Sequence, residues 1–163
     1  MRFAELASMT KQNDKYQLAI AGEFFVAAQL QRLGVSASVT YGNAKRADVV
    51  AVSRAAGRAV AIEVKSSSRS RWPVGSRVPS ASSQPWVFVH FPSEPTAPPE
   101  FFVLLQSQLH SILAPAEALY LARFKEKHSK EYGEKTPGVA SATRAELSAF
   151  KDNWQCILSA LEA

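Results

Sequence analysis

The sequence contains one cysteine, no long apolar run and none of the short motifs that mark several large enzyme classes. Cys156 alone cannot form an internal disulfide or a cysteine-based zinc cluster. No apolar stretch approaches the roughly 18 residues that a membrane-spanning helix needs, and Met1 to Lys15 is too polar for a secretory signal peptide. Gly-rich phosphate loops, G-x-S-x-G and H-E-x-x-H are absent. We therefore expect a soluble, cytoplasmic protein that does not bind a membrane.

Acidic residues are scarce in the first part of the chain, although the whole is sufficiently apolar for a folded core. The chain has 163 residues, of which 47% are hydrophobic and 20% charged, and its net charge of +5 is a weak indication of a polyanionic partner. Its first 93 residues contain five acids: Glu5, Asp14, Glu23, Asp48 and Glu63. Three of these five interrupt apolar stretches, where burying a carboxylate is costly. Those three residues need an explanation.

The hydrophobic pattern predicts an α/β or α+β domain built around a mixed sheet, with no internal repeat. A helix over 14–33 should end at Gly34. Five strands are expected, at 35–41, 47–53, 59–65, 86–91 and 101–105. Gly57 fits a positive φ in the short connection between the second and third strands. Helices are expected at 107–113, at 115–130 and after the capping box formed by Thr143 and Glu146.

Four polar residues are predicted to converge at one end of the central hairpin. Side chains two apart on a strand share a face, so Glu63 and Lys65 project together. A hairpin centred near 55–57 places Asp48 opposite about 63 to 65. On the first helix, Glu23 lies in the middle of the stripe that should face the core, which comprises Tyr16, Ile20, Glu23, Val26, Ala27 and Leu30.

This set of carboxylates and one amine suits metal-assisted phosphodiester hydrolysis. Mg²⁺ prefers oxygen ligands and typically takes one or two carboxylates together with waters and phosphate oxygens. Lys65 is suited to orienting a water or to stabilising charge on the phosphate, and Glu23 to holding the water network or a second metal. The competing interpretations are a solvent-exposed surface pair for Glu63 and Lys65, and a backbone amide or core lysine as the partner of Glu23.

The pattern Gly22-Glu23, Ala47-Asp48 and Ile62-Glu63-Val64-Lys65 resembles the PD-(D/E)XK nuclease superfamily, and most closely its branch of Holliday-junction-resolvase-like proteins. The resemblance covers roughly 16–105 and departs from the signature at Ala47, where the family has proline. It implies a restriction-endonuclease-like α-β-β-β-α-β core. It also implies that Asp48, Glu63 and the carbonyl of Val64 bind metal, that Lys65 serves the nucleophilic water and that Glu23 is an auxiliary acid. We thus expect a single nuclease-like domain over 1–163, with a core at about 14–113 and a C-terminal helical extension at about 114–163.

Basic residues near these acids are candidates for binding nucleic acid. The stretch 66–85 is rich in serine, proline and arginine, and it reads either as a flexible solvated loop or as a flap that contacts phosphates. In the second interpretation, arginine and lysine side chains contact the DNA backbone and an aromatic ring stacks on a base. The residues concerned are Lys45, Arg46, Arg69, Arg71, Trp72 and Arg77.

The leading hypothesis is an endonuclease that depends on Mg²⁺ or Mn²⁺ and hydrolyses DNA, with structured or junction DNA as one candidate substrate. The first alternative is a non-catalytic nucleic-acid-binding module on the same fold. The second is an interaction protein whose C-terminal helices bind a partner. Because cutting two strands requires two sites, we also consider a homodimer to which Phe25 contributes.

Overall fold

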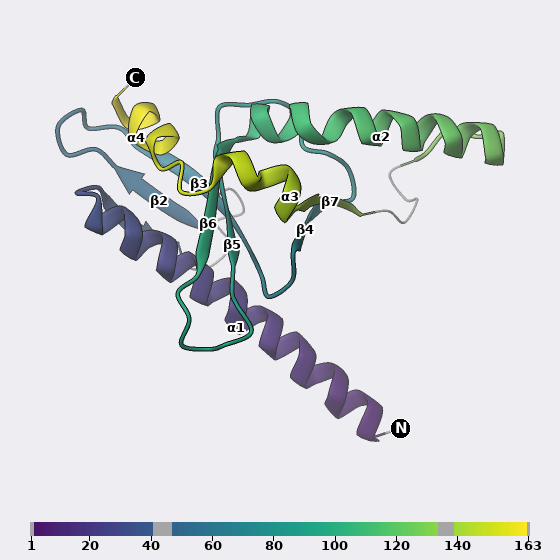
Figure 1. Cartoon of the computed structure of the whole chain (residues 1–163), viewed down its shortest axis with the longest axis horizontal. Coiled ribbons are helices and arrows are strands. Elements are labelled where there is room, and N and C mark those ends of the chain that lie inside the picture. Colours follow the sequence, from purple (N-terminus) through teal and green to yellow (C-terminus); the bar gives the residue numbers. More distant parts are fainter. Residues whose placement is uncertain (1, 41–46, 134–138, 163) are drawn as a thin grey trace.

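The computed structural model describes residues 2–40, 47–133 and 139–162, with side chains described from residue 14 onward. One long helix precedes six strands, which lead into the helix α2, and a seventh strand separates α2 from the last helices (Figure 1). The elements are α1 (Arg2–Arg32), β1 (Ser36–Val39), β2 (Val49–Val52), β3 (Ala59–Ser67), β4 (Arg71–Gly75), β5 (Pro85–His90), β6 (Glu100–Leu105), α2 (Gln106–His128), β7 (Ala140–Thr143), α3 (Arg144–Leu147), a 3₁₀ turn (Ser148–Phe150) and α4 (Gln155–Glu162).

A mixed five-stranded sheet forms the centre, in the order β1-β2-β3-β5-β6. The pairing of β3 with β5 is parallel and the other pairings are antiparallel. One sheet face, which carries Ile62 and Val64 of β3, packs against α1 and α4. The opposite face, which carries Trp86 and Phe88 of β5, packs under β4, β7 and α2. The expected α/β class with a mixed sheet is therefore confirmed.

Local turn signals in the sequence predicted the ends of two elements. Gly34 follows α1 with a φ of +83° and Gly57 turns the β2–β3 hairpin with a φ of +64°, a region that L-residues with a side chain rarely adopt. Thr143 and Glu146 form the predicted capping box, at the start of the short helix α3. Each of these signals works within a few residues of the chain, which explains why they can be read without the fold.

Two expectations about the connections were wrong. The stretch 66–85 contains the strand β4, which pairs with β7, and no helix lies between β3 and β5. The crossover helix of the α-β-β-β-α-β arrangement is thus replaced by a strand. The helices expected at 107–113 and 115–130 are one helix, α2, with Pro115 inside it. Proline forfeits one backbone hydrogen bond there, and Leu109 and Leu113, both buried, hold the preceding turns against the sheet.

The first half of α1 extends past the strands toward the N-terminus (Figure 1), and Tyr16, which we expected in the core-facing stripe, is 67% exposed. The stripe becomes buried farther along the helix, at Val26 and Leu30. The helical periodicity was therefore right, but the sheet is too short to cover the whole helix.

A close approach at Gly22 sets the position of α1 on the sheet. A Cβ atom added to Gly22 would overlap the hydroxyl oxygen of Ser66 and lie 3.1 Å from its Cβ. Ser66 belongs to β3, directly after Lys65, and its hydroxyl is buried without a hydrogen-bond partner among the described residues. The absence of a side chain at position 22 therefore lets the helix backbone rest on β3, beside the strand segment that carries Glu63 and Lys65.

We predict that Gly22→Ala destabilises the fold by about 1–2 kcal/mol, because overlap with β3 outweighs the roughly 1 kcal/mol that alanine gains in helix propensity. Ser66→Ala should recover part of this loss in the double variant, since it removes the overlapping hydroxyl. Urea denaturation of the two single variants and the double variant measures this coupling. A Gly22→Ala protein as stable as the wild type would mean that α1 does not depend on this contact.

Candidate functional site

Glu63 and Lys65 lie side by side on β3, as predicted. Their neighbours Ile62 and Val64 are buried in the core on the α1 side, so the two charged side chains point to the opposite face. The Lys65 ammonium group donates a hydrogen bond to Glu63 Oε1 at 2.5 Å, and the side chains are 31% and 22% exposed, respectively. The site is therefore partly shielded from solvent and still accessible.

Asp48 joins this pair through the register of the hairpin. Val49 pairs with Ile62, and the backbone N–H of Asp48 donates to the Ile62 carbonyl at 3.0 Å. Asp48 therefore lies just beyond the end of the paired strands, next to the segment of β3 that carries Glu63. The Asp48 carboxylate accepts a hydrogen bond from the backbone N–H of Val64 at 2.8 Å. This bond fixes the carboxylate against β3.

Glu23 approaches from α1, which packs on the other face of the sheet. It directly follows Gly22, where the helix lies closest to β3. Burial, together with the nearby charges of Asp48 and Glu63, raises the pKa of Glu23 to about 7. Glu23 therefore lies within electrostatic range of both Asp48 and Glu63.

The three acids do not form a closed metal cage. Across residues 2–40, 47–133 and 139–162, no group of three His, Cys, Asp or Glu side chains has the spacing of a metal site. Their chemistry nevertheless fits Mg²⁺, which typically takes one or two carboxylates and fills its remaining positions with waters and phosphate oxygens. Asp48 and Glu63 offer hard oxygen donors, and their mutual repulsion with Glu23 is what a divalent cation would relieve. The predicted role of the Val64 carbonyl stays a prediction.

The basic residues proposed to contact DNA differ in exposure and in their partners within the protein. Lys45 and Arg46 lie outside the described residues. Arg69 and Arg71 are exposed, near the end of β3 and on β4, as a phosphate contact requires. Arg77, in contrast, forms an ion pair with Glu117 of α2 at 3.0 Å and lies over the Tyr132 ring. Its charge is therefore already partnered within the protein.

The prediction that Trp72 stacks on a nucleotide is wrong. Its side chain is fully buried and its indole N–H donates to the Val89 carbonyl at 3.0 Å. The rings of Phe88 and Phe102 lie edge-on to it with centroids 5.7 Å away. Because Trp72 sits on β4, which the sequence analysis read as a loop, its alternation with the exposed Arg71 and Pro73 was not recognised as a strand pattern.

The sequence analysis also missed Trp86 as part of the site. The ammonium group of Lys65 lies 5.5 Å from the centroid of the Trp86 ring, a distance typical of a cation–π contact. The indole N–H of Trp86 donates to Gln106 Oε1 at 3.0 Å, which fixes the ring. The parallel pairing of β3 with β5 brings Trp86 level with Glu63, and no local pattern in the sequence could have revealed that register.

Comparison with protein-family models and with curated proteins finds no match to this chain. Among the described residues, none of the helices combines the length and the apolarity that a membrane crossing requires.

The raised pKa of Glu23 predicts a specific pH dependence of stability. Between its ordinary value of 4.5 and the value of about 7 in the protein, the folded state binds more protons than the unfolded chain. The free energy of unfolding should therefore fall as the pH rises through this window. Glu23→Gln removes the titrating group and should be more stable than the wild type at pH 8, with a smaller difference at pH 5.

Urea denaturation at both pH values, with EDTA present, measures this effect. Glu126→Gln, which removes an exposed acid of α2, is the matched control and should follow the wild type. If Glu23→Gln kept the full pH dependence of the wild type, the electrostatic link between Glu23, Asp48 and Glu63 would be refuted.

Proposed function

We propose that this protein is a metal-dependent endonuclease of the restriction-endonuclease-like type that hydrolyses DNA phosphodiester bonds. The supporting observation is the convergence of three acids from separate elements beside one ammonium group. Glu23 comes from α1, Asp48 precedes β2, and Glu63 lies next to Lys65 on β3. Repelling carboxylates held together at a partly open position are typical of functional sites rather than of structural ones.

In this proposal, Asp48 and Glu63 hold Mg²⁺ or Mn²⁺ together with the phosphate. When bound, the metal would supply a Lewis acid that polarises the scissile phosphate. The Val64 amide keeps the Asp48 carboxylate in place, and the pairing of β2 with β3 keeps Glu63 near it. The protein therefore provides an arrangement in which the two acids need little reorganisation to bind a cation.

Lys65 and Glu23 have complementary roles. The ammonium group of Lys65 is held between Glu63 and the Trp86 ring, where it can donate to a phosphate oxygen or to the attacking water. Glu23 can take up or release a proton near neutral pH, because its pKa is raised to about 7.

The substrate has an open approach to these residues. Ala59 and Ala61 of β3, on the same face as Glu63, are exposed, and Val52 of β2 is 38% exposed. Their side chains are small, so a polymer as wide as DNA can come close to the strand that carries Glu63 and Lys65. This surface is where the sheet extends beyond the layer formed by β4, β7 and α2.

A non-catalytic nucleic-acid-binding module is the alternative that one observation favours. Asp48 is bonded to a backbone amide and Glu63 to Lys65, so both acids already have partners within the protein. In such a module the acids would serve to hold α1 and the hairpin together, and binding would depend on the basic residues alone.

We predict that the purified protein cleaves DNA with Mg²⁺ or Mn²⁺ and is inactive with EDTA. Plasmid, single-stranded and four-way-junction substrates identify the preferred DNA structure. Asp48→Asn, Glu63→Gln and Lys65→Met should each lower the cleavage rate at least roughly a hundredfold, because each removes charge that the reaction requires. Gel-based initial rates measure the effect.

Arg123→Gln/Lys127→Gln is the control, since it changes two exposed side chains of α2 and should leave cleavage unchanged. Cleavage that survived Glu63→Gln and Lys65→Met would disprove the site assignment. Salt-sensitive DNA binding without cleavage of any substrate would instead establish the binding module.

A further inference from the structure

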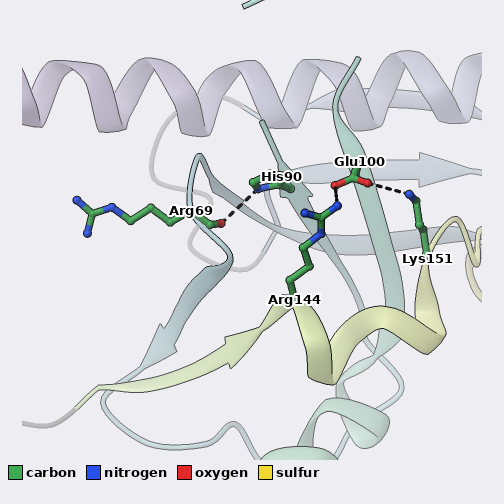
Figure 2. A network of polar contacts seen from close by, with 5 residues as sticks. All are labelled: Arg69, His90, Glu100, Arg144 and Lys151. Carbon is green, nitrogen blue, oxygen red and sulfur yellow. Dashed lines mark hydrogen bonds and ion pairs between the residues drawn. The ribbon is translucent and has the colours of Figure 1, made fainter. Parts of the chain in front are cut away.

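A second polar cavity of about 520 Å³ lies at the far end of β5 and β6. Its polar lining comes from His90 of β5, Glu100 of β6, Arg144 of α3, and Lys151 with Asp152 after the 3₁₀ turn. Figure 2 shows Arg144 and Lys151 reaching Glu100 from opposite sides. We call this group of residues the cationic cavity.

One carboxylate organises two cations in this cavity. Lys151 Nζ lies 2.8 Å from Glu100 Oε1, and Arg144 Nη2 donates to Glu100 Oε2. These partners lower the pKa of Glu100, with Lys151 having the largest effect. The Glu100 side chain is 20% exposed, whereas those of Arg144 and Lys151 are 46% and 50% exposed. The acid is therefore the inner member of the group and the two cations face solvent.

Much of the hydrogen-bonding capacity of the two cations remains for a ligand. A guanidinium group has five N–H donors and an ammonium group three, whereas Glu100 has a single negative charge. Arg71 lines an adjoining pocket together with Arg144, which extends the basic surface, and Asp152 opposes it with one negative charge. Arg71, Arg144 and Lys151 thus outnumber Glu100 and Asp152, and a ligand with concentrated negative charge would complete the arrangement.

The backbone holds both cations in position. The backbone N–H of Arg144 donates to the Ser70 carbonyl at 2.9 Å, and that of Asp152 donates to the Phe101 carbonyl at the same distance. The capping box at Thr143 fixes the start of α3. Because these groups are ordered before any ligand arrives, binding would cost little conformational entropy.

The cationic cavity lies on the same sheet face as Glu63 and Lys65. His90 pairs with Ser67 of β3 and with Glu100 of β6, and Lys65 is two residues before Ser67 on the same face. Standard strand spacings then give a separation of about 12 Å between Lys65 and Glu100 along the sheet. This distance is short enough for two phosphates a few nucleotides apart on one DNA strand to reach both positions.

We propose that the cationic cavity binds a backbone phosphate of the DNA, a few nucleotides from the phosphate that reaches Lys65. Arg144 and Lys151 contact the phosphate, and Glu100 is a positioning residue that holds them. This inference rests on the proposed function for the identity of its ligand, but not for its geometry. The contact carries no base specificity, because phosphates are the same at every nucleotide.

The test is the salt dependence of DNA binding, measured by fluorescence anisotropy with a labelled 30-bp duplex and with EDTA to prevent cleavage. Arg144→Gln/Lys151→Gln should weaken binding at least about tenfold and reduce the magnitude of the slope of log K against log[salt] by about 1, because one phosphate contact is lost. Glu100→Gln/Arg144→Gln/Lys151→Gln should behave alike. The triple variant also removes the Glu100 carboxylate, which the double variant leaves without its cationic partners. A loss of DNA binding in the triple variant therefore cannot result from instability caused by an unpaired Glu100.

Arg123→Gln/Lys127→Gln is the matched control, because it also removes one arginine and one lysine, from exposed positions of α2, and it should keep the wild-type slope. Equal losses in this control, or a wild-type slope in both cavity variants, would overturn the inference.

Glu63→Gln separates the two proposals. If it abolishes cleavage while the cavity variants bind normally, only the cavity assignment fails. If the cavity variants lose binding but no variant or wild-type protein cleaves DNA, only the nuclease fails.

Discussion

The contact between Gly22 of α1 and Ser66 of β3 is the constraint on which the candidate site depends. A side chain at position 22 would force the helix away from the strand, and Glu23 would move with it. With the helix in place, the Glu23 carboxylate is partly buried and is repelled by Asp48 and Glu63. Folding therefore holds carboxylates of like charge near one another, which lowers the stability of the protein. Such a loss of stability is typical of a site that binds a cation, and it supports the proposed nuclease activity more strongly than the E-x-K pattern alone.

The two sides of the sheet serve different purposes. On one face, α1 and α4 bury an apolar cluster around Ile62 and Ile157. On the other, β4, β7 and α2 cover only β5 and β6, where Trp72 anchors the layer. The strands β2 and β3 thereby keep an accessible surface next to the acids. At the other end of the covered region, Arg144 and Lys151 are held by Glu100 (Figure 2). In our proposals, DNA would reach the acids over the open strands and would be held by a phosphate at the cationic cavity.

The parts of the fold that the sequence predicted are those with local causes. Asp48 could be placed near residues 63 to 65 because a short hairpin connects the two strands, and Glu23 could be placed on the core-facing side of α1 by its helical period. Failures came from contacts between distant segments. Arg71 of β4 pairs with Thr143 of β7, so neither short strand could be recognised alone, and Trp72 was assigned to a loop. For the same reason, the sequence could not predict two ion pairs: that of Arg77 with Glu117 and that of Arg144 with Glu100.

The most direct test of the central claim is to locate a bound divalent cation. Crystals soaked with Mn²⁺ would reveal its position by anomalous scattering, independently of any assay of cleavage. Our account predicts one anomalous peak in contact with the carboxylates of Asp48 and Glu63, near Glu23, and no such peak in crystals of Asp48→Asn/Glu63→Gln protein. Crystals at millimolar Mn²⁺ without a peak between these two carboxylates, or with Mn²⁺ bound only elsewhere, would contradict it.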